Sequence, residues 1–235
     1  DNSTIYASYF SQMDAYSEGY AGIGVWRAAF KPFVDRIADN DIRLQWFCCD
    51  RSTGVDTEDK DGKPIRVTLL RDTETPASVE YQAVKFIGTG RENIQTGTFS
   101  GWELGDYIYM RSEEAYLIKI EALAHKNSPD AVTELENFMK TRQPDYDYTF
   151  TNKADLIEEI IYQKRVEFWG EGLEYIDNRR LNIPVDRTDE TWGAENNNHF
   201  SAAKFRYNQE ERPFLYQLPL SEIENNSQLS PTDQN

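Results

Sequence analysis

Apolar residues recur at helical spacing in two neighbouring segments of the second half of the chain. The apolar positions of residues 106–125 are Ile108, Ala115, Leu117, Ile118, Ala122 and Leu123. Those of residues 131–139 are Ala131, Val132, Leu135, Phe138 and Met139. Because residues three and four apart share one face of an α-helix, both segments are predicted to be helices. The link around Pro129 is so short that the two helices must pack as an antiparallel hairpin.

A third helix is predicted to start near Asn152, a residue type that caps helix starts, with Asp155 placing an acid in the first turn. Its apolar stripe comprises Leu156, Ile157, Ile160, Ile161, Phe168 and Trp169. Gly170 and Gly172 interrupt this pattern and are predicted to end the helix. A short fourth helix then follows through Arg179.

The first half of the chain shows shorter patterns. Residues 44–49 form an apolar run that is consistent with a buried strand, and alternation across residues 65–70 predicts a second strand. The acidic segment from Asp56 to Asp61 lies between them and is predicted to form the tip of a hairpin or a long loop. Its carboxylates would attract calcium, but Lys60 stands where an EF-hand pattern needs a ligand. We therefore favour a solvated acidic turn.

Proline and glycine mark further boundaries. Pro32 interrupts a helix that is predicted to begin at Phe30, and five glycines in residues 88–105 predict an irregular crossing segment. Beyond Pro184 the chain is rich in Asn, which predicts an extended tail bound to the surface.

Together these patterns divide the 235 residues into four parts. They are an aromatic-rich loop and helix segment (1–38), a strand and loop segment (39–105), a helical part (106–181) and an extended tail (182–235). The predicted fold class is mainly α, with long loops, a small β-hairpin and a helical hairpin. This hairpin resembles a single tetratricopeptide unit, whose small and apolar positions are matched by Ile118, Ala122, Ala131 and Leu135.

Charge and composition exclude several classes of function. The chain carries 41 acidic and 25 basic side chains, a formal charge of −16, which argues against nucleic-acid binding because phosphate contacts need a basic surface. No segment approaches the roughly 18 consecutive apolar residues of a membrane span, so membrane association would need a lipid anchor or a partner. No cofactor motif occurs, and the two histidines, His125 and His199, lack the spacing of zinc ligands.

Charged residues are densest around Gly170 and Gly172, where they comprise Lys164, Arg165, Glu167, Glu171, Glu174, Asp177, Arg179 and Arg180. Glu167 and Glu171, four residues apart, would share one helical face, and a glycoside hydrolase needs such a pair of carboxylates. The arginines of this segment would instead keep both carboxylates ionised rather than raise one pKa. We therefore favour a buried network of arginines and carboxylates that joins two helices.

Aromatic residues supply the candidate binding chemistry, since the chain has 14 Tyr and 5 Trp. Both types join a flat apolar face to a polar edge, which is the surface on which a sugar ring stacks. Tyr16, Tyr20 and Trp26 lie among Gly and Ser and are predicted to form a stacking platform. Trp102, between Gly101 and Glu103, is a second candidate.

Three segments resemble the SusD/RagB family, the surface glycan-binding lipoproteins of Bacteroidetes. In residues 163–180 the positions that match the family signature are Arg165, Glu167, Glu171, Gly172, Tyr175, Asp177, Arg179 and Arg180. Residues 109–122, which include Arg111, resemble the family's helix with an Arg, an Ala-Glu pair and a Tyr-Leu pair. Residues 214–226 resemble its closing Leu-Pro and Glu-Ile segment. Family members are longer, and this chain resembles only their carboxyl-terminal half.

The resemblance implies a mostly helical fold, no enzymatic activity and no cofactor. It implies capture of oligosaccharides at the bacterial outer membrane, for uptake through a SusC-like TonB-dependent transporter, with a lipid anchor outside this chain. The signature residues are then assigned to structure, and no binding residue is carried over. The residues alone leave two alternatives open: a glycoside hydrolase that uses Glu167 and Glu171, or a scaffold whose helical hairpin binds a protein partner.

Overall fold

The computed structural model describes residues 29–48, 54–58, 64–68, 82–83, 85, 109–211, 218–230 and 232. The chain divides into two compact units, Asp1–Glu171 and Gly172–Asn235. Helices make up most of the described secondary structure, as the apolar spacing predicted. Among the described residues, no helix combines the length and the apolar character needed to cross a membrane.

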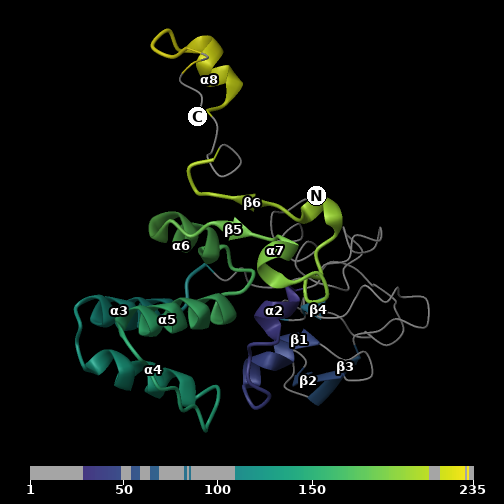
Figure 1. The fold of residues 1–235 in the computed structure, drawn as a ribbon, viewed down its shortest axis with the longest axis vertical. Coiled ribbons are helices and arrows are strands. Elements are labelled where there is room, and N and C mark those ends of the chain that lie inside the picture. The colour runs from purple at the N-terminus through teal and green to yellow at the C-terminus, as the bar shows by residue number, and fades with distance from the viewer. Residues whose placement is uncertain are drawn as a thin grey trace. The chain divides into compact units, whose positions relative to one another are not determined.

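Three helices form the carboxyl-terminal part of the first unit: α3 (Ser112–His125), α4 (Asp130–Lys140) and α5 (Lys153–Glu167). Helix α3 packs against both α4 and α5, and the three lie together in Figure 1. All three predicted helices are therefore confirmed. Helix α3 begins later than the predicted residue 106, because Arg111 is still in an extended conformation.

Contacts between α3 and α4 confirm the antiparallel hairpin. Tyr116, near the start of α3, stacks on Phe138, near the end of α4. Lys119, one turn further along α3, pairs with Glu134, one turn earlier in α4, at 2.8 Å between Nζ and Oε1. Contacts that move toward the end of α3 while they move toward the start of α4 occur only when the two helices run in opposite directions.

The buried faces of the two hairpin helices were predicted with different success. In α4 the buried apolar residues are Ala131, Leu135, Phe138 and Met139, all of them in the predicted stripe. In α3 the buried apolar residues are Leu117, Ile120 and Ala124. The prediction was wrong for Ala115, Ile118 and Ala122, which are exposed. Apolar residues occur on both sides of α3, so their spacing alone does not select the face that packs.

Helix α5 starts where the sequence predicted. The side chain of Asn152 accepts hydrogen bonds from the backbone N–H groups of Ala154 (2.8 Å) and Asp155 (3.1 Å), which are two of the donors that a helix start leaves unpaired. Its buried apolar residues include Leu156, Ile160, Ile161 and Val166. The helix ends at Glu167, and Gly172, at φ +84°, adopts a left-handed conformation that glycine tolerates before the next helix begins.

A second group of buried residues joins the amino-terminal described segment to α5. It comprises Ala29, Val34, Ile37, Phe47, Tyr162 and Val166. Phe33 lies edge-on to Phe47 and to Tyr162, with ring centroids 5.8 Å apart in both pairs. The single-turn helix α2 (Lys31–Val34), with Pro32 in its first turn, is shorter than predicted.

The strand predicted over residues 44–49 is largely replaced by a 3₁₀-helix, η1 (Ile42–Trp46), which leads into the two-residue strand β1 (Phe47–Cys48). Asp41 causes the difference, because its carboxylate accepts a hydrogen bond from the backbone N–H of Arg43 at 2.8 Å and caps the turn. Strand β1 pairs antiparallel with β4 (Gln82–Ala83).

A small β-hairpin is confirmed, but its first strand is not the predicted one. Strand β2 (Gly54–Glu58), which includes Asp56 from the predicted acidic turn, pairs antiparallel with β3 (Pro64–Thr68), with Val55 opposite Val67. The side chains of the acidic segment from Asp56 to Asp61 lie outside the described residues, so calcium binding there stays untested.

The second unit contains α6 (Leu173–Leu181), β5 (Val185–Asp186), α7 (Asp189–Trp192), η3 (Ser201–Ala203), β6 (Arg206–Tyr207) and α8 (Leu220–Asn225). Strands β5 and β6 pair antiparallel, with Val185 opposite Tyr207. The segment after Pro184 thus holds short elements where the sequence predicted an extended tail. Buried Gln209 anchors it by donating a hydrogen bond from Nε2 to the carbonyl of Ile183 at 2.6 Å.

Candidate functional site

Glu167, the last residue of α5, lies at the centre of a buried group of charges. Its side chain is 4% exposed. Arg111 donates to Oε1 at 2.9 Å, and Arg142 donates to both carboxylate oxygens, at 3.0 and 3.2 Å. Arg43 approaches Oε2 at 3.5 Å. One carboxylate therefore faces three guanidinium groups.

Glu171 lies beside it, and its carboxylate accepts hydrogen bonds from Arg111, which it shares with Glu167, and from Lys85. Arg111 donates from Nη2 to Oε1 at 2.8 Å and from Nε to Oε2 at 3.1 Å, and Lys85 donates to Oε1 at 2.6 Å. Lys85 also donates to the backbone carbonyls of Glu167 (2.6 Å) and Trp169 (3.1 Å). We name this group the α5-end cluster, and it comprises Arg43, Lys85, Arg111, Arg142, Glu167 and Glu171.

The α5-end cluster holds Glu167 in its ionised form. Burial acts to raise the pKa of Glu167, but hydrogen bonds from Arg142 and Arg111 and the charge of Arg43 outweigh it, so the pKa lies below its ordinary value. A general acid in glycoside hydrolysis needs the opposite, a carboxyl group that stays protonated near neutral pH. The electrostatics of Glu167 therefore fit an ion-pair network better than acid catalysis.

The basic partners differ from those that the sequence suggested. Arg179 donates to the carbonyl of Gln209, and Arg180 pairs with Asp177 at 2.7 Å, both within the second unit. The partners of Glu167 instead come from η1, from the residue before α3 and from the link after α4. These positions are 25 to 124 residues away along the chain, and no local pattern connects them to α5.

Lys85 makes the stability of the first unit depend on pH. Burial lowers the pKa of Lys85 from 10.5 to about 8, against the opposing effect of Glu171. An unfolded chain keeps the ordinary lysine pKa, so from pH 8 to pH 10.5 the unfolded state binds a proton that the folded state has released. The free energy of unfolding should therefore rise with pH in this window, by about 1.5 kcal/mol between pH 8 and pH 9.5 from Lys85 alone.

Urea titrations at pH 8, 8.5, 9 and 9.5, made on the unchanged chain and on Lys85→Met, measure this contribution. Glu171, Arg111 and Glu167 also face Lys85, so the free energy of unfolding of Lys85→Met is subtracted from that of the unchanged chain at each pH. This difference in the free energy of unfolding should increase as the pH rises. Parallel pH dependence in the two proteins would contradict it.

A cavity of about 220 Å³ lies next to the α5-end cluster, and Arg43 belongs to both. It is lined by Arg36, Ile37, Ala38, Asp41, Arg43, Gln143, Tyr146, Asp147, Tyr148, Glu159, Tyr162, Gln163 and Val166, and we name it the tyrosine pocket. Three segments build it: the chain from the turn after α2 into η1, the link after α4 and one face of α5. The sequence did not predict this pocket, because its residues come together only when these segments pack.

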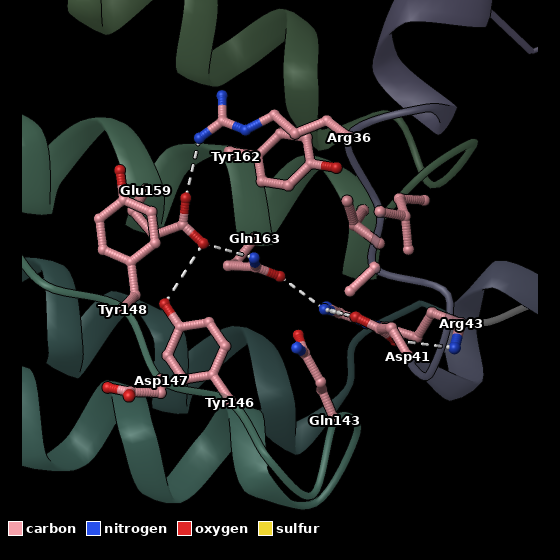
Figure 2. Close-up of a pocket in the computed structure, with 13 residues that line it drawn as sticks. Arg36, Asp41, Arg43, Gln143, Tyr146, Asp147, Tyr148, Glu159, Tyr162 and Gln163 are labelled. Atoms are coloured by element: carbon pink, nitrogen blue, oxygen red, sulfur yellow. Dashed lines mark hydrogen bonds and ion pairs between the residues drawn. The ribbon is translucent and has the colours of Figure 1, made fainter.

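Glu159 is the central acceptor of the tyrosine pocket (Figure 2). It accepts hydrogen bonds from Arg36 at 2.8 Å, from Nε2 of Gln163 at 2.6 Å and from the hydroxyl of Tyr146 at 3.3 Å. Burial and the nearby charge of Glu159 raise the pKa of Tyr146, so its hydroxyl stays a donor. Arg36 also covers one face of the Tyr162 ring, 3.9 Å from its centroid.

A second chain of bonds continues from Gln163. Its Oε1 accepts from Nη2 of Arg43 at 2.5 Å, and Arg43 donates twice more to the carboxylate of Asp41, at 2.7 and 3.0 Å. By contrast, the side-chain amide of Gln143 forms no hydrogen bond with any described residue. Figure 2 shows this amide pointing inward between Tyr146 and Asp41.

The four residues predicted to bind sugar, Tyr16, Tyr20, Trp26 and Trp102, lie outside the described residues. Their role stays a prediction. Within the described ranges, no group of three or more His, Cys, Asp and Glu side chains is arranged to hold a metal ion.

Comparison with known proteins identifies the family. A sequence model of the SusD family matches residues 28–235. The crystal structure of a SusD-like carbohydrate binding protein from Bacteroides vulgatus matches with a TM-score of 0.58 at 20% identity, over 95% of this chain and 45% of that one. No protein with a curated description matches the chain. The mainly α, SusD-like fold implied by the sequence is thereby confirmed, and the chain belongs to the SusD family.

Proposed function

We propose that this chain is part of a non-catalytic protein that binds oligosaccharides or polysaccharides at the bacterial cell surface. The observation that carries the proposal is the SusD family match over residues 28–235. The fold supports it, because the matching protein from Bacteroides vulgatus is described as a SusD-like carbohydrate binding protein. This chain spans 45% of the length of that protein.

The proposal extends to location and partner. A lipid anchor would hold the protein at the outer membrane, and a SusC-like TonB-dependent transporter would take up the captured glycan. Glycan capture needs no bond cleavage, and its binding energy comes from aromatic stacking and a few directed hydrogen bonds. The ionised state of Glu167 supports a binding protein over a hydrolase that uses Glu167 and Glu171.

Calorimetric titration with a panel of neutral oligosaccharides tests the function, and Trp26→Ala tests the predicted platform. Loss of a central tryptophan commonly costs about 2 kcal/mol of binding, so the affinity should fall about 30-fold. Trp192→Ala, in α7, is the matched control. Trp192 is 38% exposed and lies outside the predicted platform, so this variant should bind as the unchanged chain does.

Three results would count against the proposal in different ways. Unchanged affinity in Trp26→Ala would remove Trp26 from the site. Absence of binding to every glycan would overturn the glycan-binding function. Release of new reducing ends during the titration, lost in Glu171→Gln, would show a hydrolase instead.

A further inference from the structure

We propose that the tyrosine pocket is an additional carbohydrate contact, which holds one uncharged sugar ring at the end of a neutral glycan. This inference rests on the proposed glycan-binding function and names both the site and the class of sugar. Four features of the pocket support it: the size of the cavity, the tyrosines that line it, the side-chain amide of Gln143 and the pairing of its charged groups.

Size and lining favour a single sugar ring. The cavity of about 220 Å³ is smaller than the roughly 300–1,000 Å³ of sites for drug-sized ligands, so it accommodates one small ring but not a longer chain. Tyr146, Tyr148 and Tyr162 contribute three rings to its wall. Tyrosine combines an apolar face with a polar edge, as a sugar ring does.

Gln143 supplies the polar group that a ligand needs. The tyrosine hydroxyls are already used, because Tyr146 donates to Glu159, Tyr148 to Asp155 and Tyr162 to the carbonyl of Phe33. The amide of Gln143 offers two donors and an acceptor that have no partner among the described residues. A sugar hydroxyl is both donor and acceptor, so it satisfies an amide in either direction.

The pairing of charges selects uncharged sugars. Arg36 pairs with Glu159 at 2.8 Å and with Glu158 at 3.6 Å. Arg43 pairs with Asp41 at 2.7 Å and with Glu167 at 3.5 Å, so each guanidinium already faces two carboxylates. An anionic sugar would have to displace a buried carboxylate or leave its own charge unpaired, and both cost free energy. Asp147, exposed at the pocket and without a partner among the described residues, adds a negative charge that repels anions.

Gln143→Ala tests the site, with Gln45→Ala as the matched control. Gln45 is an exposed residue of η1 that does not line the pocket, so the two variants differ in location and not in chemistry. The side chain of Gln143 makes no bond within the described structure, so the fold should persist, as a thermal melt will verify. Calorimetry would use maltotetraose, cellotetraose, xylotetraose, mannotetraose and the acidic tetragalacturonate.

The unchanged chain should bind at least one neutral tetrasaccharide and bind tetragalacturonate at least tenfold more weakly. Gln143→Ala should weaken the neutral complex about fivefold, the effect of one hydrogen bond worth about 1 kcal/mol, and Gln45→Ala should not. Equal affinities in the two variants, with binding intact, would overturn the pocket and leave the proposed function standing. Preference for tetragalacturonate would overturn the selection of uncharged sugars. Absence of binding to all five probes would overturn both proposals.

Discussion

Replacing Glu167 by Gln is expected to lower the free energy of unfolding by about 3–5 kcal/mol. The variant keeps the shape of the side chain but removes the negative charge that Arg43, Arg111 and Arg142 share. Arg43 retains Asp41 and Arg111 retains Glu171, but Arg142 has no other carboxylate among the described residues. An uncompensated positive charge in a buried cluster is costly, because the surrounding protein solvates it poorly. Denaturation in urea, followed by far-ultraviolet circular dichroism, measures the loss.

Glu136→Gln provides the matched control for Glu167→Gln. Glu136 pairs with Lys140 one turn further along α4, at 3.1 Å, and both side chains are exposed. Such surface pairs contribute no more than about 0.5 kcal/mol, so the control should unfold almost as the unchanged chain does. If the two variants lost the same stability, the α5-end cluster would not have the structural role that its geometry indicates.

Ile120→Ala is expected to cost about 2–5 kcal/mol of stability. Ile120 lies in α3, which packs against α4 and α5, and it is fully buried, at 0% exposure. Truncation to Ala loses the transfer free energy of the removed methyl groups and leaves a cavity in the packed interior. The midpoint of urea unfolding should fall, while an unchanged slope of free energy against denaturant would show that the surface exposed on unfolding is the same.

Ile118→Ala controls for the chemistry of this substitution. Ile118 lies two residues earlier in the same helix, but its side chain is 50% exposed. Its replacement should be close to neutral, because little buried surface is lost and Ala has the higher helix propensity. A large loss in Ile118→Ala, or a small one in Ile120→Ala, would contradict the assignment of the buried face of α3.

Local features of the sequence were enough to predict several elements. Asn152 and the apolar residues that follow it predicted α5, and the short link at Pro129 predicted the helical hairpin. Alternation in residues 65–70 predicted the strand that pairs in the β2–β3 hairpin. Capping, turn and spacing effects act over a few residues along the chain, so they can be read from the order of residues alone.

The buried face of α3 and the conformation of residues 44–49 could not be predicted from the spacing of apolar residues alone. Ile118 and Ile120 have the same side chain on the same helix, and only the packing of α4 and α5 decides which of them is buried. Residues 44–49 are apolar enough for a strand, but the cap that Asp41 provides for the turn at Arg43 favours η1. Apolar character predicts burial better than it predicts backbone conformation.

The sequence by itself determined the family, the main helices and the presence of a dense group of charges around Glu167 and Glu171. Only the tertiary structure decided which basic residues neutralise those carboxylates, and that Gln143 lies with Tyr146 and Glu159 in one pocket. The reason is physical: ion pairs and pockets join side chains from segments that are distant along the chain. Their meeting depends on how the helices pack, and the local spacing of residues does not contain that information.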